Sequence, residues 1–298
     1  MKLIHAVTIV LALVLTVSCL AIWVSSSVQD FMDANTNWNG IQDFYERFEI
    51  ASIEDVSDLA GVSPAAILVV IPYLHYAQDE IADLNRFMLN GGTILLMDDF
   101  GFGNDLLERF GVEARFSGEL LLDPLFCDRN PLLPRVSLFA EALDKRGINL
   151  VTMNRGTTLT GVSEANALAW SSPISFLDVN ADGVQDRDEP AGSMVLAARY
   201  IIGQGALVLV SDPSVAINTM LARGDNLILM EYLLFQHSAG GEVLLDRSHL
   251  VESTLDISKT MLLNLREGLS RPQALVGVVA LVMVVISLNA VGKGNRIG

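Results

Sequence analysis

The sequence predicts an α/β protein built on a doubly wound sheet, with an apolar helix at each end of the chain. Short apolar runs such as 66–71 and 93–97 have the length and the β-branched content of strands buried on both faces. These runs alternate with segments of helical spacing, an order typical of parallel sheets covered by helices on both sides. Two uncharged apolar runs predict the terminal helices.

The terminal runs predict membrane anchors. Residues 3–24 have few polar interruptions, and a run of about 22 residues is long enough to cross a hydrocarbon core of about 30 Å. A cleaved signal peptide is the alternative, with the small residues Ser25–Ser27 as its cleavage site. Residues 273–291 carry no charge and predict a second spanning helix.

Charge predicts the orientation of the chain and excludes one class of partner. Acidic residues outnumber basic ones by 35 to 19, and all of them lie between the two apolar runs. Lys2, Lys293 and Arg296 flank these runs, which places both termini in the cytoplasm and the acidic part outside the membrane. The segment between the two runs is therefore strongly acidic, which argues against binding of the negatively charged nucleic acids. Cys19 and Cys127 leave no disulfide within the body, and the expected partners are the lipid bilayer and membrane proteins.

The chain therefore divides into five segments. They are an anchor (3–24), a stalk and edge segment (25–65), an α/β ectodomain (66–250), a juxtamembrane helix (251–272) and a second spanning helix (273–291).

The predicted elements follow the chain in order. The first are helix 41–48, strand 66–71, helix 76–90, strand 93–97 and helix 104–110, the last capped by Asn104 or Asp105. A looser middle has strands 120–125, 148–153 and 157–159 and helix 138–144. Strands 167–170 and 174–177 lead into an acidic loop, and a hairpin of 194–202 and 205–210 follows it. The last are helices 215–222 and 226–237, the second capped by Asp225, strand 243–245 and the amphipathic segment 254–269.

The acidic loop 178–189 has the spacing of an EF-hand-type calcium loop. Calcium takes six to eight oxygens, which alternate side chains of a curled loop can supply, and Gly183 at position 6 permits the turn. The predicted Ca²⁺ ligands are Asp178, Asn180, Asp182, Val184 through its carbonyl, Asp186 and Glu189. The alternative is an acidic turn in solvent. Flanking strands and Pro190 argue against the helix pair of a calcium sensor, so we expect a calcium-stabilised connection.

Polar side chains follow the predicted strands at their carboxyl ends, where open α/β sheets bind ligands. The candidate ligand cleft consists of His75, Asp98, Asp99, Asn104, Asp212, Asn218, Asp246 and His249. Turns and helix N-caps require the same residue types, which is the alternative explanation. No catalytic residue is predicted, because the sequence has no Gly-x-Ser-x-Gly or Gly-x-Cys-x-Gly elbow and Cys127 lies on no strand-to-helix turn. Gly101 and Gly103 complete neither a dinucleotide fingerprint nor a P-loop.

Four motifs carry a family resemblance: the run 91–104, Asp123-Pro124, the acidic loop, and the run 212–226. Together they resemble a prokaryotic, largely archaeal family of membrane-anchored proteins of unknown function, whose ectodomain is similar to class I glutamine amidotransferases. The resemblance implies a flavodoxin-like fold over residues 67–249. It also implies a binding or scaffolding role, because related domains occur in auxiliary subunits of gliding and ABC-transport assemblies. Amidotransferases use an elbow cysteine that this sequence lacks, so the resemblance transfers no catalytic residue.

Three functions follow from these observations. The favoured one is a non-catalytic, calcium-stabilised, extracytoplasmic binding or scaffold domain within a transport or envelope complex. The second is a hydrolase or ligand-binding protein that uses Asp98, Asp99, Asp212 and His249, and it requires these side chains to converge on an open cleft. The third is a calcium-dependent adhesion or sensing module.

Overall fold

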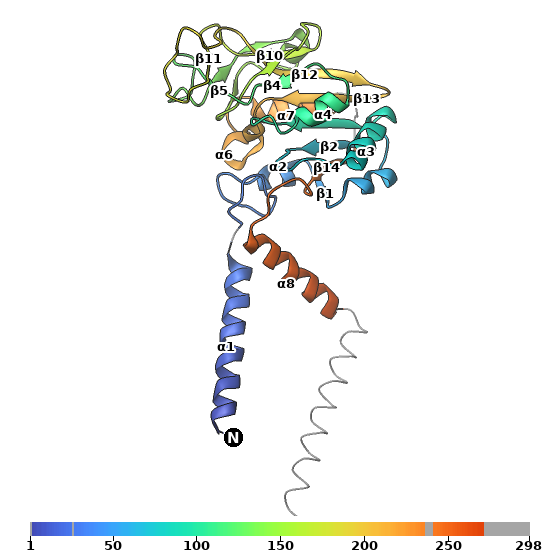
Figure 1. Ribbon diagram of the computed structural model, residues 1–298, viewed down its shortest axis with the longest axis vertical. Coiled ribbons are helices and arrows are strands. Elements are labelled where there is room, and N and C mark those ends of the chain that lie inside the picture. Colours follow the sequence, from blue (N-terminus) through green and yellow to red (C-terminus); the bar gives the residue numbers. More distant parts are fainter. Residues whose placement is uncertain (1, 26, 236–240, 271–298) are drawn as a thin grey trace, which may run out of the picture. The chain divides into compact units, whose positions relative to one another are not determined.

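The computed structural model describes residues 2–25, 27–235 and 241–270. The chain forms two compact units (Figure 1). One is Val28–Val251, and the other comprises the described parts of Met1–Ser27 and Glu252–Gly298.

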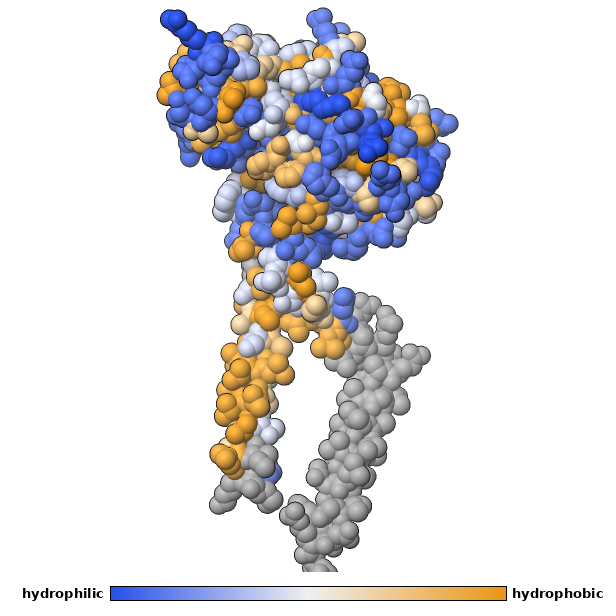
Figure 2. Space-filling model, viewed as in Figure 1, coloured by the Kyte–Doolittle hydropathy of each residue, from blue (hydrophilic) through white to orange (hydrophobic). Residues whose placement is uncertain are grey.

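The terminal unit contains two helices, α1 (Lys2–Val24) and α8 (Thr254–Ser270). Among the described residues, the stretch His5–Val24 of α1 is the one that is long and apolar enough to cross a membrane. Figure 2 shows that the surface of α1 is mainly hydrophobic, while the larger unit is mostly hydrophilic. Helix α8 confirms that the predicted amphipathic segment 254–269 is helical, and the guanidinium of Arg266 lies 5.7 Å from the ring centre of Trp23 in α1. The predicted spanning helix 273–291 lies outside the described residues.

One large sheet runs through the unit 28–251. Its strand order is β1-β14-β2-β3-β13-β12-β10-β7, with β9 beside β12 and β4 beside β9. The first five neighbours are parallel to one another: β1 (Ala51–Ile53), β14 (Val243–Asp246), β2 (Ile67–Val70), β3 (Thr93–Met97) and β13 (Gly205–Val210). This confirms the mixed α/β class and the parallel strands predicted from the apolar runs.

The rest of the sheet is antiparallel. It contains β12 (Val195–Ile202), β10 (Ala167–Trp170), β7 (Leu138–Phe139), β9 (Leu159–Thr160) and β4 (Arg115–Phe116). The predicted hairpin is present, with Ile202 opposite Gly205 and Gly203 at a φ of +62° in the turn. Two small sheets add to this end: β11 (Phe176–Asp178) with β5 (Leu120–Leu122), and β6 (Arg135–Val136) with β8 (Val151–Thr152).

Helices cover both faces of the parallel strands because side chains alternate between the faces along each strand. In β2, Ile67 and Val69 join one apolar cluster, and Leu68 and Val70 join another. The first cluster contains residues of α2 (Gln42–Arg47), α6 (Asn218–Leu221) and α7 (Asn226–Phe235). The second contains residues of the 3₁₀ helix η1 (Val56–Gly61), α3 (Gln78–Leu89) and α4 (Asn104–Arg109). Each fully buried aliphatic side chain contributes about 1.5–3 kcal/mol.

The segment predicted as stalk and edge belongs to the core of this unit from residue 28 onward. Phe31, Met32 and Phe44 are buried, and β1 extends the sheet at its edge beside β14. Phe31, Phe44 and Phe48 therefore pack in the apolar cluster, whereas Trp38 is exposed. Sequence pattern missed β1 because a strand of three residues is too short to show a period.

Three predicted elements differ in detail. The N-cap of α4 is Gly103, without a side-chain cap, so the prediction that Asn104 or Asp105 caps this helix is wrong. The helix predicted at 138–144 begins as strand β7 and becomes helical only in α5 (Glu141–Asp144). The helix predicted at 215–222 is divided into the 3₁₀ helix η2 (Pro213–Ala216) and α6.

Candidate functional site

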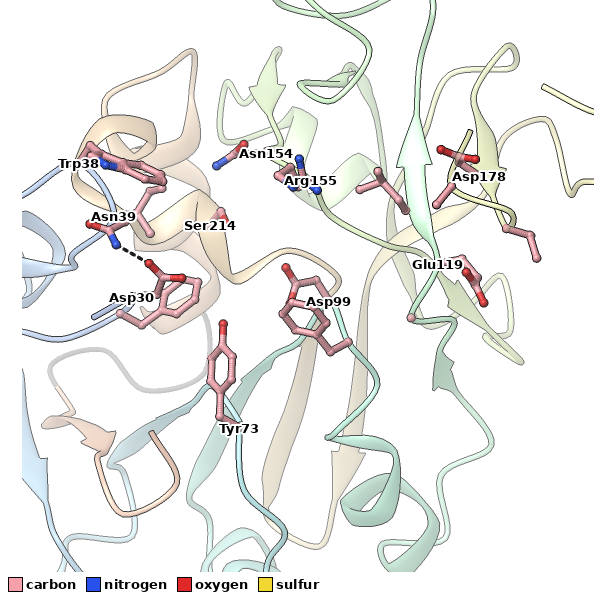
Figure 3. A pocket seen from close by; sticks show the side chains of 17 residues that line it. Asp30, Trp38, Asn39, Tyr73, Asp99, Glu119, Asn154, Arg155, Asp178 and Ser214 are labelled. Carbon is pink, nitrogen blue, oxygen red and sulfur yellow. Dashed lines mark hydrogen bonds between the residues drawn. The ribbon is translucent and has the colours of Figure 1, made fainter. Parts of the chain in front are cut away.

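A cavity of about 430 Å³ lies beyond the carboxyl ends of the parallel strands β2, β3 and β13. Loops from both halves of the unit line it, including the first residues of the predicted calcium loop (Figure 3). Its walls are formed by Asp30, Phe31, Trp38, Asn39, Tyr73, Asp99, Phe100, Gly118, Glu119, Leu120, Asn154, Arg155, Asp178, Val179, Ala181, Ser214 and Ile217. The position agrees with the expectation that open α/β sheets bind ligands at this edge.

Asp98 and Asp212 follow two neighbouring strands, but their carboxylates bind backbone groups. Oδ1 of Asp98 accepts from the N–H of Phe100 and of Gly101, and Oδ2 accepts from Gly103 at 2.6 Å. The carboxylate of Asp212 accepts from Asn154 N–H at 2.6 Å and from Ser214 N–H at 2.8 Å, where it caps η2. Burial raises the pKa of Asp98, and burial raises the pKa of Asp212 to about 7 although these hydrogen bonds oppose it.

Asp99 is the member of the predicted cluster that faces the cavity (Figure 3). Burial raises the pKa of Asp99 to about 8, and the nearby carboxylates of Asp212 and Asp98 add to the rise. The guanidinium of Arg155 opposes this shift only in part. Asp99 is therefore mostly protonated at neutral pH, and it can donate or accept a hydrogen bond at the cavity wall.

The other predicted cleft residues lie apart from the cavity. His75 pairs with Asp105 at 2.8 Å on the exposed surface. Asn104 bonds the backbone of Phe116 through both ends of its amide. Asn218 bonds the N-terminal segment, donating to the carbonyls of Asn35 and Asn37.

Asp246 and His249 form a buried network of their own. Nδ1 of His249 lies 2.9 Å from Oδ2 of Asp246, and the hydroxyl of Tyr76 donates to the same carboxylate at 2.5 Å. The imidazole stacks on the ring of Tyr76, with centroids 3.5 Å apart, and its Nε2 lies 3.4 Å from Glu80. The predicted cluster is thus divided among separate sites, and its four acid–base residues do not converge on one open cleft.

The predicted calcium loop is curled by its own side chains. The carboxylate of Asp178 accepts from the N–H groups of Asp182 at 3.1 Å and Gly183 at 3.0 Å. The carboxylate of Glu189 closes the loop by accepting from Val179 at 2.8 Å and Asp186 at 3.0 Å. The carboxylates at positions 1 and 12 therefore each hold part of the loop backbone.

The donor set of this loop suits a hard cation, although its side chains are not gathered around one point. Across the described part of the chain, no group of three or more His, Cys, Asp or Glu side chains is placed to hold a metal ion. The amide nitrogen of Asn180 donates to Asp182 at 3.2 Å and to Asp186 at 3.1 Å. The amide N–H of Asn180 therefore takes the place beside the carboxylates of Asp182 and Asp186 that a bound cation would take. Rotation of this amide by half a turn would present its oxygen, a possible ligand, to the two carboxylates instead. The oxygen-rich donors fit calcium chemically.

Sequence reasoning missed most of the cavity wall, but one signal was present. Loop 35–46 has the spacing of loop 178–189, with asparagine at positions 1 and 5, and it carries the cavity residues Trp38 and Asn39. Matching residues at positions 3, 6, 8, 9 and 12 are Asn37 and Asn180, Gly40 and Gly183, Gln42 and Gln185, Asp43 and Asp186, and Glu46 and Glu189. The cavity therefore lies between two loops of the same pattern. No sequence signal identifies Tyr73, Asn154 or Arg155.

Comparison with solved structures supports the fold of this unit. One similar structure is the mmIFT52 N-terminal domain, which is 17% identical, with a TM-score of 0.53, and the match covers 67% of this chain and 90% of that chain. Two β-galactosidases, Gan42B of G. stearothermophilus and that of Bacillus circulans sp. alkalophilus, have TM-scores of 0.32 and 0.33 at 17% and 12% identity. Each match covers 56% of this chain and only 21% and 22% of the enzymes, so nothing about activity follows from it.

Comparison of the sequence with protein families gives a match to a domain of unknown function over residues 33–234. No curated protein matches the sequence. The matched range contains the whole cavity wall except Asp30 and Phe31, and it contains both loops of the shared pattern. The chain belongs to the family defined by the domain of unknown function DUF4350.

Proposed function

We propose that this chain is a membrane-anchored, extracytoplasmic binding domain without catalysis of its own, acting within a transport or envelope complex. The cavity at the carboxyl edge of the sheet carries the proposal. Of the predicted polar cluster, Asp99 lines that cavity, while the carboxylates of Asp98 and Asp212 bind backbone N–H groups. The cavity wall contains no histidine and no cysteine, the two residues that most often provide a base or a strong nucleophile.

The anchoring part of the proposal rests on charge and hydropathy. Helix α1 has the length and composition of a spanning helix, and residues 273–291 have the composition of a second one. All acidic residues lie between these two segments, and the charged residues on their terminal sides, Lys2, Lys293 and Arg296, are basic, which favours cytoplasmic termini and a body outside the membrane. We further propose a flavodoxin-like class, similar to class I glutamine amidotransferases, because helices cover both faces of five parallel strands.

Calcium is proposed as a structural ligand of loop 178–189. Asp178, Asn180, Asp182, the carbonyl of Val184, Asp186 and Glu189 would hold it. The bound ion would supply positive charge to an exposed loop that contains five carboxylates and one arginine. An extracytoplasmic position suits such a site, because calcium is abundant there.

The alternative is a hydrolase or ligand-converting protein, and one observation favours it. Asp99, with a pKa of about 8, has the property of a general acid at the wall of a cavity. Such an enzyme would use water or the hydroxyl of Ser214 as its nucleophile, because Cys127 is not part of the cavity wall.

Purification of the tagged full chain from detergent-solubilised membranes of its own host tests the proposal. We expect a membrane protein to accompany the wild-type chain, and the cavity variants Tyr73→Ala and Asp99→Asn to lose it. The surface variant Asp105→Asn, which removes an exposed carboxylate paired with His75, is the matched control and should retain it. Recovery of the same protein with all variants, or of the chain alone, would overturn the proposal.

A further inference from the structure

Acidic side chains outnumber basic ones on the cavity wall. Asp30, Asp99, Glu119 and Asp178 line it, against the single guanidinium of Arg155. Asp98 and Asp212 lie close enough behind the wall to raise the pKa of Asp99, so this carboxyl group is mostly protonated at neutral pH. A cation bound beside Asp99 would favour its ionised form, because a nearby opposite charge stabilises a carboxylate.

The negative field also reaches the phenol of Tyr73. Burial raises its pKa well above the usual value, and the carboxylates of Asp99, Asp30 and Asp98 raise it further. Figure 3 shows the hydroxyl of Tyr73 between Asp30 on one side and Asp99 on the other. The pKa values of Tyr73, which follows β2, and of Asp99, which follows β3, are thus both raised by the carboxylates around the cavity.

Four aromatic rings, those of Phe31, Trp38, Tyr73 and Phe100, also line the wall. The ring of Tyr73 lies 6.0 Å from that of Phe31 and 6.0 Å from that of Phe100. Trp38 and Phe100 are 63% and 61% exposed, which is high for such large aromatic side chains. Aromatic faces beside carboxylates are the combination that binds organic ammonium groups, because the ring faces and the carboxylates both attract positive charge.

We infer that this cavity binds an organic cation, with its ammonium group between Asp30, Asp99 and Tyr73 and its carbon substituents against Phe31, Phe100 and Trp38. The inference rests on the proposed binding function and names the chemical class of the ligand. The volume of about 430 Å³ falls within the range of small-molecule sites. A neutral polyol would leave the excess negative charge uncompensated.

Calorimetric titration of the full chain in detergent micelles with choline tests the inference. The matched probe is 3,3-dimethyl-1-butanol, which has the shape of choline but no charge. We expect choline to bind at least tenfold more tightly than the neutral isostere. Tyr73→Ala and Asp30→Asn should each weaken choline binding about tenfold, and Asp105→Asn, outside the cavity, should leave it unchanged.

The pH dependence of choline binding gives a second, independent readout, because choline keeps its charge at all pH values. The titratable or charged groups on the cavity wall are Asp30, Tyr73, Asp99, Glu119, Arg155 and Asp178, and those of Asp98 and Asp212 lie behind it. Asp212 and Asp99 ionise near pH 7 and 8, so affinity should rise between pH 6 and pH 9 and protons should be released on binding. Asp99→Asn should remove the upper part of this rise, while Asp105→Asn keeps it.

The outcomes separate the inference from the proposed function. Equal binding of choline and its isostere, or no pH dependence, overturns the cation inference. If Tyr73→Ala loses the membrane partner in the purification experiment while choline fails to bind, the binding function stands and the assigned ligand class is wrong. If choline binds as expected while the partner is retained by every variant, the ligand class stands and the proposed partner site is wrong.

Discussion

Loops 35–46 and 178–189 share one spacing, but they are stabilised in different ways. In loop 35–46, Asn35 is fully buried, and its amide donates to the carbonyl of Gln29 at 2.7 Å and accepts from Asn37 N–H at 2.9 Å. The side chains of Ile41 and Phe44 enter the apolar core. In loop 178–189, the side chains after Asp178 are mostly exposed, and carboxylates hold the turn together.

The difference shows that spacing alone does not decide whether a loop depends on a cation. Loop 35–46 has two carboxylates, and neutral amides at positions 1 and 5 satisfy the backbone without extra charge. Loop 178–189 has five carboxylates in the same length and no apolar core beneath most of it. Burial and hydrogen bonding stabilise the first loop, whereas the second has repulsion that calcium would relieve.

Alanine at the two matching glycines should give the largest contrast. A Cβ at Gly40 would lie 1.8 Å from the backbone oxygen of Asn35, so Gly40→Ala should lower the free energy of unfolding by more than about 3 kcal/mol. At Gly183 a Cβ would have no neighbour within 4 Å, and only the φ of +77° opposes a side chain. Gly183→Ala should therefore lower the free energy of unfolding by about 1 kcal/mol.

Thermal unfolding of both variants as full chains in detergent micelles measures this contrast. If Gly40→Ala does not fold well enough for a melting scan, the yields of monodisperse protein can be compared instead. The yield of Gly40→Ala should be lower than that of Gly183→Ala. Equal melting temperatures for the two variants would show that the two glycines have the same role.

Calcium should act on loop 178–189 only. At a hundredfold excess over Kd, the ion should stabilise the wild-type chain by about 2.7 kcal/mol, visible as a rise in Tm. Asp178→Ala, at position 1, should abolish the rise. Asp188→Ala removes an exposed carboxylate from position 11, which supplies no ligand in this pattern, and should keep it. An unchanged Tm of the wild-type chain on adding calcium would contradict the calcium assignment.

Placing an aspartate at position 1 of loop 35–46 should not make the stability of this loop depend on calcium. Asn35→Asp replaces an amide that donates to Gln29 O and Asn39 Oδ1 by a buried carboxylate facing those oxygens. We expect a loss of about 1–3 kcal/mol in stability, with or without calcium. Unfolding scans of Asn35→Asp at both calcium levels measure this, and a gain of stability that appears only with calcium would show that spacing outweighs burial.

The elements of the fold that have a local sequence pattern could be predicted. The residues of the cavity wall could not. The buried strands β2 and β3 and helix α3 were found from apolar runs and helical spacing within single segments. Asp99 was identified because carboxyl ends of parallel strands are known binding edges. Tyr73, Arg155 and Trp38 come together only through the tertiary fold, from segments far apart in sequence.

Single residues also show why function was harder to predict than fold. Asp98, Asp99 and Asp212 are equivalent by sequence, each following a buried strand. Which carboxylate binds backbone and which faces the cavity depends on where the N–H groups of Gly103 and Asn154 lie. That depends on turn geometry, which residue type alone does not determine.

The last prediction concerns Asp99, on the cavity wall between the two loops. Its pKa is about 8 in the folded chain and near the usual 3.8 when unfolded, so the folded state retains a proton over that range. Its favourable contribution is full below the unfolded pKa and is lost as the pH rises through 8. Asp99→Asn, which stays neutral, should therefore be more stable than the wild-type chain at pH 8.5 and equal to it near pH 4. Melting scans from pH 4 to pH 9, with the exposed Asp105→Asn as control, measure the difference. A difference that does not change with pH would mean that Asp99 is ionised throughout, and that the cavity between the loops already compensates its charge.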